Sequence, residues 1–397
     1  MPSPTIMIAG AGLGGLTAAA VLLQRGYRVR VYEQAPLLGE IGAGIQISAN
    51  ASRVLHALGL EPRLAAAAVT PAAFHYRLYS NGDLLHEIPL GEAHERRYGA
   101  KYYHLHRADL HSVLAAKVRE LDPDAIVLEA AAHRFAETRD SVTLHFADGR
   151  SASGDLLIGA DGIKSAIRAQ ILGPSNATFT GYVSWRALVP AARLPANFME
   201  RVCTNWVGPA AHVIVYYLRR GEILNFVGLV EDDAWRDESW TVKAPWERLK
   251  ADFAPWNAQV QTLIDAMDKD QCYRWAMYDR APVSGWSTAR VTLLGDAAHP
   301  TLPFMAQGAA MAIEDGMVLA RALEAAPSIA AALELYERTR RERTARVTTG
   351  SSELGQLYHL RTESELRAAF GRRDLATERG SWLYSYDPLT APLGVAS

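Results

Sequence analysis

The sequence predicts an α/β fold in which a β-rich segment interrupts a domain of alternating strands and helices. Three observations predict it. A strand, a glycine-rich turn and a helix follow one another within the first 24 residues; the middle of the chain is rich in short strands; and a strand followed by two helical stretches returns after residue 284. Alternating strands and helices predict a mostly parallel sheet, and the change of pattern predicts a second domain.

The N-terminal stretch TIMIAGAGLGGLTAAAVLLQ joins a predicted strand over 5–9 to a predicted helix over 16–23. Gly10, Gly12 and Gly15 stand in G-x-G-x-x-G register in the turn between them. The first glycine permits the tight turn, the second lets a pyrophosphate approach the backbone, and the third lets the helix pack on the strand. Since a helix N-terminus attracts phosphate, the stretch predicts a Rossmann-like dinucleotide site.

A second predicted strand, over 28–32, ends in Glu33. This carboxylate follows Gly10 by 23 residues, close to the spacing of about 20 at which an acid binds a ribose hydroxyl. A glutamate, rather than a basic residue, favours a ribose with a free 2′-hydroxyl. NAD and FAD both contain adenosine diphosphate, so this motif alone does not distinguish them.

The rest of the chain alternates between helical and strand-like patterns. Helical spacing is predicted over 48–64, 110–121, 246–267, 308–324 and 329–349, and strands over 72–89, 126–149, 154–160, 182–189, 212–218, 223–230 and 290–294. We therefore predict a discontinuous first domain over 1–175 and 284–350, an inserted β-rich domain over 176–283, and a C-terminal segment over 351–397. The composition of the last residues predicts a loose tail, and the basic run over 336–347 predicts a solvated helix face.

The composition is that of an ordinary globular protein. The 397 residues are 49% hydrophobic and carry a net charge of −2, which disfavours nucleic acid and anionic membranes as partners. Cys203 and Cys272 are too few for a disulfide framework and form no metal-binding pair. With no signal peptide and no apolar run of about 18 residues, we expect a cytoplasmic protein with neither a membrane span nor a metal site.

Two aspartates stand where a predicted strand ends beside a glycine. LLIGADGIKSAIR places Asp161 before Gly162, and VTLLGDAAHP places Asp296 after Gly295. A carboxylate at such a strand end can accept hydrogen bonds from ribose or ribityl hydroxyls. Each aspartate alone is equally typical of a helix N-cap.

Together, in this order and at these separations, the three glycine-containing stretches resemble the single-component flavin-dependent aromatic hydroxylases over essentially the whole chain. In that family the D-G stretch, matched by Asp161, Gly162, Ser165 and Arg168, joins FAD binding to NAD(P)H binding, and the aspartate of the G-D stretch binds the ribityl chain. YVSWRALVP and MAQGAAMAIED are similar to phrases of salicylate-type hydroxylases and 6-hydroxynicotinate 3-monooxygenase. The resemblance implies a fold like that of para-hydroxybenzoate hydroxylase.

The resemblance also implies which residues hold FAD. GAGIQISAN and LHRADL resemble family segments near the flavin, and 303–309 leads into a helix whose N-terminus would face the flavin ring. The implied FAD residues are Gly10, Gly12, Leu13, Gly14, Gly15, Glu33, Gln34, Gln46, Arg107, Asp161, Gly295, Asp296, Gly308 and Ala309.

By the same resemblance, NADH or NADPH reduces FAD, O₂ adds at flavin C4a, and the hydroperoxide hydroxylates a small hydroxylated aromatic or N-heteroaromatic acid, with or without loss of its carboxylate. No second dinucleotide fold is evident, so the coenzyme is expected to bind transiently. Two alternatives stay open: another FAD oxidoreductase, such as an epoxidase or dehydrogenase, and a non-catalytic flavoprotein sensor. We expect a monomer or homodimer.

Substrate contacts are expected from the β-rich domain. His212 and Tyr216 are four residues apart and share a face of a strand, so they are the candidate catalytic residues; both could equally be core residues. Cys203 and Phe304 are the candidate substrate-binding residues. Phe304 stands where the resemblance to the hydroxynicotinate enzyme implies a histidine, which points to a different ring. His299 is expected to be structural rather than a general base.

Overall fold

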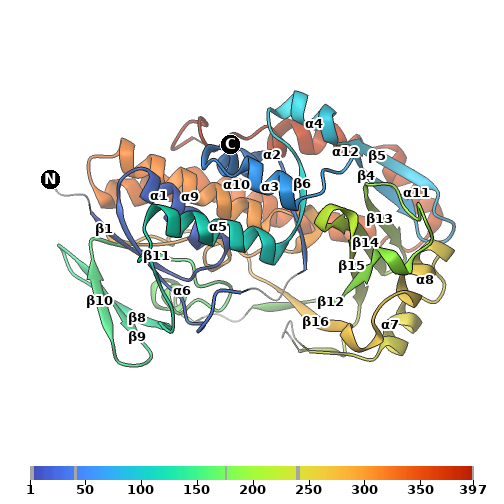
Figure 1. Cartoon of the computed structure of the whole chain (residues 1–397), viewed down its shortest axis with the longest axis horizontal. Coiled ribbons are helices and arrows are strands. Elements are labelled where there is room, and N and C mark those ends of the chain that lie inside the picture. Colours follow the sequence, from blue (N-terminus) through green and yellow to red (C-terminus); the bar gives the residue numbers. More distant parts are fainter. Residues whose placement is uncertain (1–3, 40–42, 175–176, 238–241, 396–397) are drawn as a thin grey trace.

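The computed structural model describes residues 4–39, 43–174, 177–237 and 242–395. Its sheets and helices confirm the predicted α/β class. Figure 1 shows a sheet with its covering helices at one end of the molecule and a larger sheet, flanked by α7 (Trp246–Asp252) and α8 (Ala258–Asp265), at the other. In the described part of the chain, no helix combines the length and hydropathy of a membrane span.

A five-stranded parallel sheet forms the centre of the first part of the fold, in the order β17-β11-β1-β2-β7. The strands β1 and β11 are largely or fully buried, whereas β2 buries only Val29 and Val31. The bounds are β1 Thr5–Ala9, β2 Arg28–Tyr32, β7 Ile126–Val127, β11 Leu156–Gly159 and β17 Val291–Leu293.

Helix α1 (Leu13–Gln24) packs very closely against α9 (Gly308–Ala325), and glycines permit it. A Cβ on Gly14 would lie 2.9 Å from the Cβ of Ala312, and a Cβ on Gly316 would lie 2.9 Å from the backbone nitrogen of Ala18. The extra glycine in the N-terminal turn therefore serves helix packing.

The second large sheet has seven strands in the order β16-β12-β15-β14-β13-β4-β5. Two of them, β4 and β5, come from residues 73–89, so the chain enters this sheet earlier than the predicted start at residue 176. The parallel pairing of β4 with β13 joins residues about 130 positions apart, which no local pattern shows. The predicted boundary at 175 and 176 lies outside the described residues. The bounds are β4 Ala73–Leu78, β5 Leu84–Pro89, β12 Thr178–Pro190, β13 Cys203–Gly208, β14 Ala211–Leu218, β15 Ile223–Glu231 and β16 Tyr273–Asp279.

The remaining strands form two smaller sheets, in the orders β10-β9-β8 and β3-β6, and further helices accompany them. The helical pattern over 48–64 is two helices, because Gly59 at φ +75° ends the first. The bounds are α2 Ala49–Ala57, α3 Glu61–Ala67, α4 Gly91–Tyr98, α5 Arg107–Leu121, α6 Ala166–Leu172, α7 Trp246–Asp252, α8 Ala258–Asp265, β3 Gly44–Ile47, β6 Tyr103–His106, β8 Ala132–Glu137, β9 Val142–Phe146 and β10 Ser151–Gly154.

The predicted loose tail is wrong. Helix α10 runs over Ile329–Tyr358, well past residue 349, and α11 (Glu363–Gly371), α12 (Leu375–Arg379) and a turn of π-helix (Gly380–Tyr384) follow it. Their apolar side chains are buried in one core cluster with residues of β4 and β13. Glycine, serine and tyrosine gave the segment a loop-like composition, but its spaced apolar residues cover the seven-stranded sheet.

The predicted solvated face on α10 is also wrong at its centre. Arg340 and Arg343 are buried, and their guanidinium groups pair with two adjacent carboxylates of α9. Arg343 lies 2.8 Å from Glu314, and Arg340 lies 2.7 Å from Glu314 and 2.6 Å from Asp315. The charges that made the run look solvated are neutralised by partners far away in the sequence.

These carboxylates also bind two segments that the sequence singled out. Asp315 accepts a hydrogen bond from the backbone of Gly295 at 2.9 Å and contacts the ring of His299 at 2.8 Å, so His299 has a structural partner. Glu314 accepts a hydrogen bond from the Asn50 amide at 2.5 Å. One buried network therefore joins the start of α2, the G-D stretch, α9 and α10.

This network predicts acid sensitivity. Burial alone would raise the pKa of Asp315, but the positive charges of His299 and Arg340 outweigh it and lower the pKa to about 2. An unfolded aspartate titrates near about 3.9. Ionised Asp315 therefore stabilises the fold fully above about pH 5. As the pH falls from about 4 to about 2, the free energy of unfolding should decrease by about 2 kcal/mol. We expect the free energy of unfolding in urea to fall over this window.

Two variants isolate the contribution of Asp315. Asp315→Asn should flatten the pH dependence of the unfolding free energy below pH 4, whereas Asp270→Asn, at an exposed carboxylate, should leave it unchanged. Equal slopes for the unaltered protein and Asp315→Asn would contradict the assignment.

Candidate active site

The glycine turn between β1 and α1 has the geometry of a phosphate cradle. Gly10 has φ +105°, and a Cβ there would lie 2.4 Å from the carbonyl oxygen of Ala160. A Cβ on Gly15 would lie 2.1 Å from the carbonyl oxygen of Gly10, whereas a Cβ on Gly12 would meet nothing within 4 Å. Gly12 is the N-cap residue of α1 and offers no capping side chain. Open space therefore faces the N-terminus of a 12-residue helix that starts at Leu13, which suits a pyrophosphate.

Glu33 lies at the end of β2, beside this turn. Its carboxylate accepts hydrogen bonds from the backbone nitrogens of Ala11 at 2.8 Å and Ala35 at 2.9 Å. It thus fixes the second residue of the glycine turn and stands at the edge of the sheet where a ribose would lie. Gln34, the next residue, is exposed.

Asp296, Arg107 and the start of α9 lie close together. The side chain of Asp296 is exposed between two buried neighbours, and a Cβ on Gly308 would lie 4.0 Å from its Oδ1. Desolvation by the surrounding protein raises the pKa of the Asp296 carboxyl, while the charges of Arg107 and His299 oppose this. Gly308 and Ala309 form the first turn of an 18-residue helix, whose N-terminus favours nearby negative charge.

Asp161 has partners of its own. Its carboxylate accepts hydrogen bonds from the hydroxyl of Ser165 and, at 2.9 Å, from the backbone nitrogen of Ala166, so it holds the start of α6. Arg168, on that helix, donates to the carbonyl oxygens of Ala297 and Ala298 at 2.8 and 2.9 Å. The structure thereby ties the D-G stretch to the G-D stretch.

Cys203, His212 and Tyr216 lie on one face of the seven-stranded sheet. The C-terminal helices pack against this face, which we call the inner face. Cys203 on β13 and Tyr216 on β14 are the neighbours of the paired residues Thr204 and Val215. Gln46, on β3, lies against both strands: its amide nitrogen is 3.5 Å from the Cys203 sulfur. A Cβ on Gly44 would lie 2.6 Å from the Tyr216 ring. The strand β3 thus brings Gln46, an expected FAD residue, against Cys203 and Tyr216.

His212 lies further along the same face of β14, beside Phe304. The two rings are 5.3 Å apart, and the ring of Tyr358 is 5.2 Å from that of His212. His212 is fully buried, and its Nε2 has no hydrogen-bond partner. Its Nδ1 lies 2.7 Å from the Nε2 of His359. Burial, reinforced by His359, holds the pKa of His212 well below its usual range, so its ring is neutral at pH 7.

A chain of contacts leads from His212 to the surface. The Nδ1 of His359 lies 3.2 Å from a carboxylate oxygen of Glu231, whose other oxygen accepts a hydrogen bond from Arg361 at 2.7 Å. Burial lowers the pKa of His359, and Glu231 opposes this. The sequence did not point to His359 or Arg361, because both lie in the segment expected to be a tail and neither belongs to a motif.

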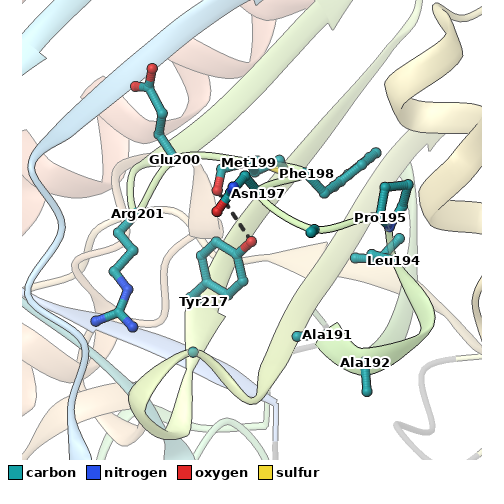
Figure 2. A pocket seen from close by; sticks show the side chains of 12 residues that line it. Ala191, Ala192, Leu194, Pro195, Asn197, Phe198, Met199, Glu200, Arg201 and Tyr217 are labelled. Atoms are coloured by element: carbon teal, nitrogen blue, oxygen red, sulfur yellow. Dashed lines mark hydrogen bonds between the residues drawn. The ribbon is translucent and has the colours of Figure 1, made fainter.

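A cavity of about 660 Å³ lies away from these residues, on the opposite face of β14 (Figure 2). Tyr217, whose hydroxyl donates to the carbonyl oxygen of Met199 at 3.2 Å, stands at its centre. None of the predicted site residues lines it. Within the described ranges, no group of three or more histidine, cysteine or acidic residues is arranged to hold a metal ion.

The chain is similar to known proteins in sequence and in fold. A family model described as FAD binding domain matches residues 3–351. The chain belongs to this family. The open space at Gly12 and the exposed Asp296 beside α9 are what an FAD pyrophosphate and ribityl chain require, so the residues present fit the cofactor.

Relatives share almost the full length of the chain. The 3-amino-4-hydroxybenzoate 2-monooxygenase of Streptomyces platensis is 40% identical over 395 residues, covering 98% of each chain. The 6-hydroxynicotinate 3-monooxygenase of Pseudomonas fluorescens is 37% identical over 396 residues, covering 98% of this chain and 97% of the other. A salicylate hydroxylase, solved as a substrate complex, superposes with a TM-score of 0.81 at 26% identity, covering 97% and 96% of the two chains.

These findings confirm three predictions. The chain is a flavin-dependent aromatic monooxygenase of the predicted class, its fold is the FAD-binding α/β fold of these hydroxylases, and FAD is its cofactor, with NADH or NADPH as co-substrate. The roles assigned to individual residues remain predictions.

Gly12 gives a direct test of the phosphate cradle. Its φ of −69° suits any residue and a Cβ would meet only open space, so Gly12→Ala should fold normally. The added methyl group should hold the pyrophosphate off the helix N-terminus and weaken FAD binding at least about 10-fold. Flavin absorbance after gel filtration measures this. Gly371→Ala, also in open space but far from the turn, is the control, and full flavin retention by Gly12→Ala would contradict the cradle.

Proposed function

We propose that the protein hydroxylates a small aromatic acid that carries a ring hydroxyl, held between the inner face of the seven-stranded sheet and the N-terminus of α9. The observation that carries the proposal is the contact of β3 with Cys203 and Tyr216, because it joins the expected FAD residues to the expected substrate residues. The full-length relatives support it, since both are monooxygenases of hydroxylated ring acids by name.

The reaction needs a cofactor because no amino-acid side chain activates O₂. FAD, when bound, supplies the electrons and the oxygen activation. The chain's own residues must hold negative charge beside the ring system, exclude water and manage a proton. The N-terminus of α9 is suited to the first task, and the fully buried side chains around Tyr216 to the second.

The proton is the part of the chemistry that His212 can manage. A ring carbon becomes more nucleophilic when the neighbouring hydroxyl loses its proton, and the neutral imidazole of His212 can accept that proton at Nε2. Because its lowered pKa makes His212 a weak base, it must pass its Nδ1 proton on to His359 as it accepts the new one. The Nε2 of His212 is buried and without a partner, while its Nδ1 contacts His359. We assign His212 as the acceptor, and His359 with Glu231 as the path by which the proton reaches solvent.

The proposal extends to the setting of the reaction. We place it in the cytoplasm, and we expect the protein to act as a monomer or homodimer without a nucleic-acid or membrane partner.

The test is coenzyme oxidation by the FAD-loaded protein with a panel of ring acids: salicylate, 3- and 4-hydroxybenzoate, 3-amino-4-hydroxybenzoate and 6-hydroxynicotinate. We expect at least one acid to accelerate NADH or NADPH oxidation and to gain one oxygen atom by mass, or to gain oxygen and lose CO₂. Acceleration without a hydroxylated product would mean that the ring is only an effector. Slow oxidation with every ring would favour a flavoprotein sensor.

The proton path predicts a particular defect in turnover. His359→Gln keeps an amide able to hydrogen-bond His212 but cannot relay a proton, so kcat should fall about 10- to 100-fold with little change in KM. The pH profile of kcat should shift as well, which a packing defect would not cause. Glu231→Gln should show a smaller effect in the same direction. The groups that face His359 and could contribute to the profile are His212, Glu231, Arg361 and Tyr182.

Glu353→Gln serves as the control, because this carboxylate is exposed on α10. A His359→Gln variant with altered KM or stability but an unchanged pH profile of kcat would show that His359 only supports the structure.

A further inference from the structure

Arg379, the last residue of α12, is a buried cation without an anionic partner. Its side chain is 4% exposed, and no carboxylate of the described chain lies within ion-pair distance of it. Its Nη2 donates to the hydroxyl of Tyr358 at 2.9 Å, its guanidinium also hydrogen-bonds Tyr384, and its Nε has no partner. The guanidinium otherwise lies over the rings of Phe74 and Tyr76, at 5.6 and 5.8 Å from their centroids.

The contrast with other buried arginines shows how unusual this is. Arg340 and Arg343 each pair with Glu314, and Arg274 pairs with Asp232 at 2.6 Å. An arginine stays charged in a protein, and a buried charge without an opposite charge is strongly destabilising. The surroundings of Arg379 therefore call for an anion that is not part of the chain.

One further residue whose side chain has no partner, Asn205, lies on the same side of the sheet. Both side-chain polar atoms of Asn205 are buried and unpaired. Asn205 stands beside Tyr76 on β4 and two residues from Cys203, on the same face of β13. The side chain of Tyr358 links this region to the catalytic candidate, because its ring packs on His212 while its hydroxyl binds Arg379.

We infer that Arg379, supported by Asn205 and Tyr358, is the anchor for the carboxylate of the aromatic acid. This inference rests on the proposed function and adds the group that selects acids. A planar guanidinium binds a carboxylate through two parallel hydrogen bonds, which fixes orientation as well as position. With its carboxylate at Arg379, a ring acid directs its other side toward His212. The C-terminal segment then contributes a residue to the substrate site.

The test compares an acid with its uncharged amide in equilibrium binding to the oxidised, FAD-loaded protein. Titration calorimetry with 4-hydroxybenzoate and 4-hydroxybenzamide, or with the acid and amide of whichever panel member binds, needs no turnover. We expect Arg379→Met to weaken binding of the acid about 10- to 100-fold and binding of the amide less than about 3-fold. Arg379→Lys keeps the charge but loses the paired geometry, so it should lie between Arg379→Met and the unaltered protein.

Two other variants keep the inference testable if Arg379→Met does not fold. Asn205→Asp supplies an internal anion on the side of the sheet where Arg379 lies, next to Tyr76, so it should abolish acid binding while the amide still binds. Arg372→Met, at an exposed arginine of the same segment, is the control and should bind both ligands normally.

The outcomes separate this inference from the proposed function. Equal weakening of acid and amide in Arg379→Lys or Asn205→Asp, or no change in either, overturns the anchor while leaving the reaction intact. Failure of every ring acid to bind the unaltered protein overturns the proposed function itself.

Discussion

Two adjacent buried carboxylates on α9 pair with two buried arginines on α10, and this pairing fixes how the two helices sit against each other. Glu314 and Asp315 stand side by side on α9, where without Arg340 and Arg343 their charges would repel and would be costly to bury. Each carboxylate also binds a segment beside the expected FAD site, through Asn50 and Gly295. The position of the α9 N-terminus is therefore set by electrostatics as much as by packing.

The same arginines connect the cofactor side of the molecule to the C-terminal segment. Arg343 donates to the carbonyl oxygens of Trp382 and Leu383 at 3.0 and 3.1 Å. That segment covers the inner face of the seven-stranded sheet and carries Tyr358, His359 and Arg379 toward it. The middle of α10 thus pairs with α9 beside the expected FAD site, and the C-terminal end of α10 contacts the expected substrate residue His212.

Much of the first part of the fold follows from the sequence, because its signals are local. The glycine turn, Glu33 and the strand-end aspartates each lie within a few residues of the structure they specify, and the strand, helix and strand over residues 5–32 follow one another as predicted. The misplaced features depend on pairings between distant segments. The parallel pairing of β4 with β13 and the burial of Arg340 against Asp315 leave no trace in a local pattern. Arg379 and His359 were missed for the same reason.

Oxygen-isotope incorporation during turnover, with the panel acid that accelerates coenzyme oxidation, would show whether the protein hydroxylates a ring with O₂. In the presence of ¹⁸O₂ and ordinary water, we expect each molecule of hydroxylated product to carry one ¹⁸O atom. In the coupled reaction, one molecule of product should form for each NADH or NADPH consumed. A product whose new oxygen comes from water, or coenzyme consumption that yields only peroxide at every substrate concentration, would contradict this expectation.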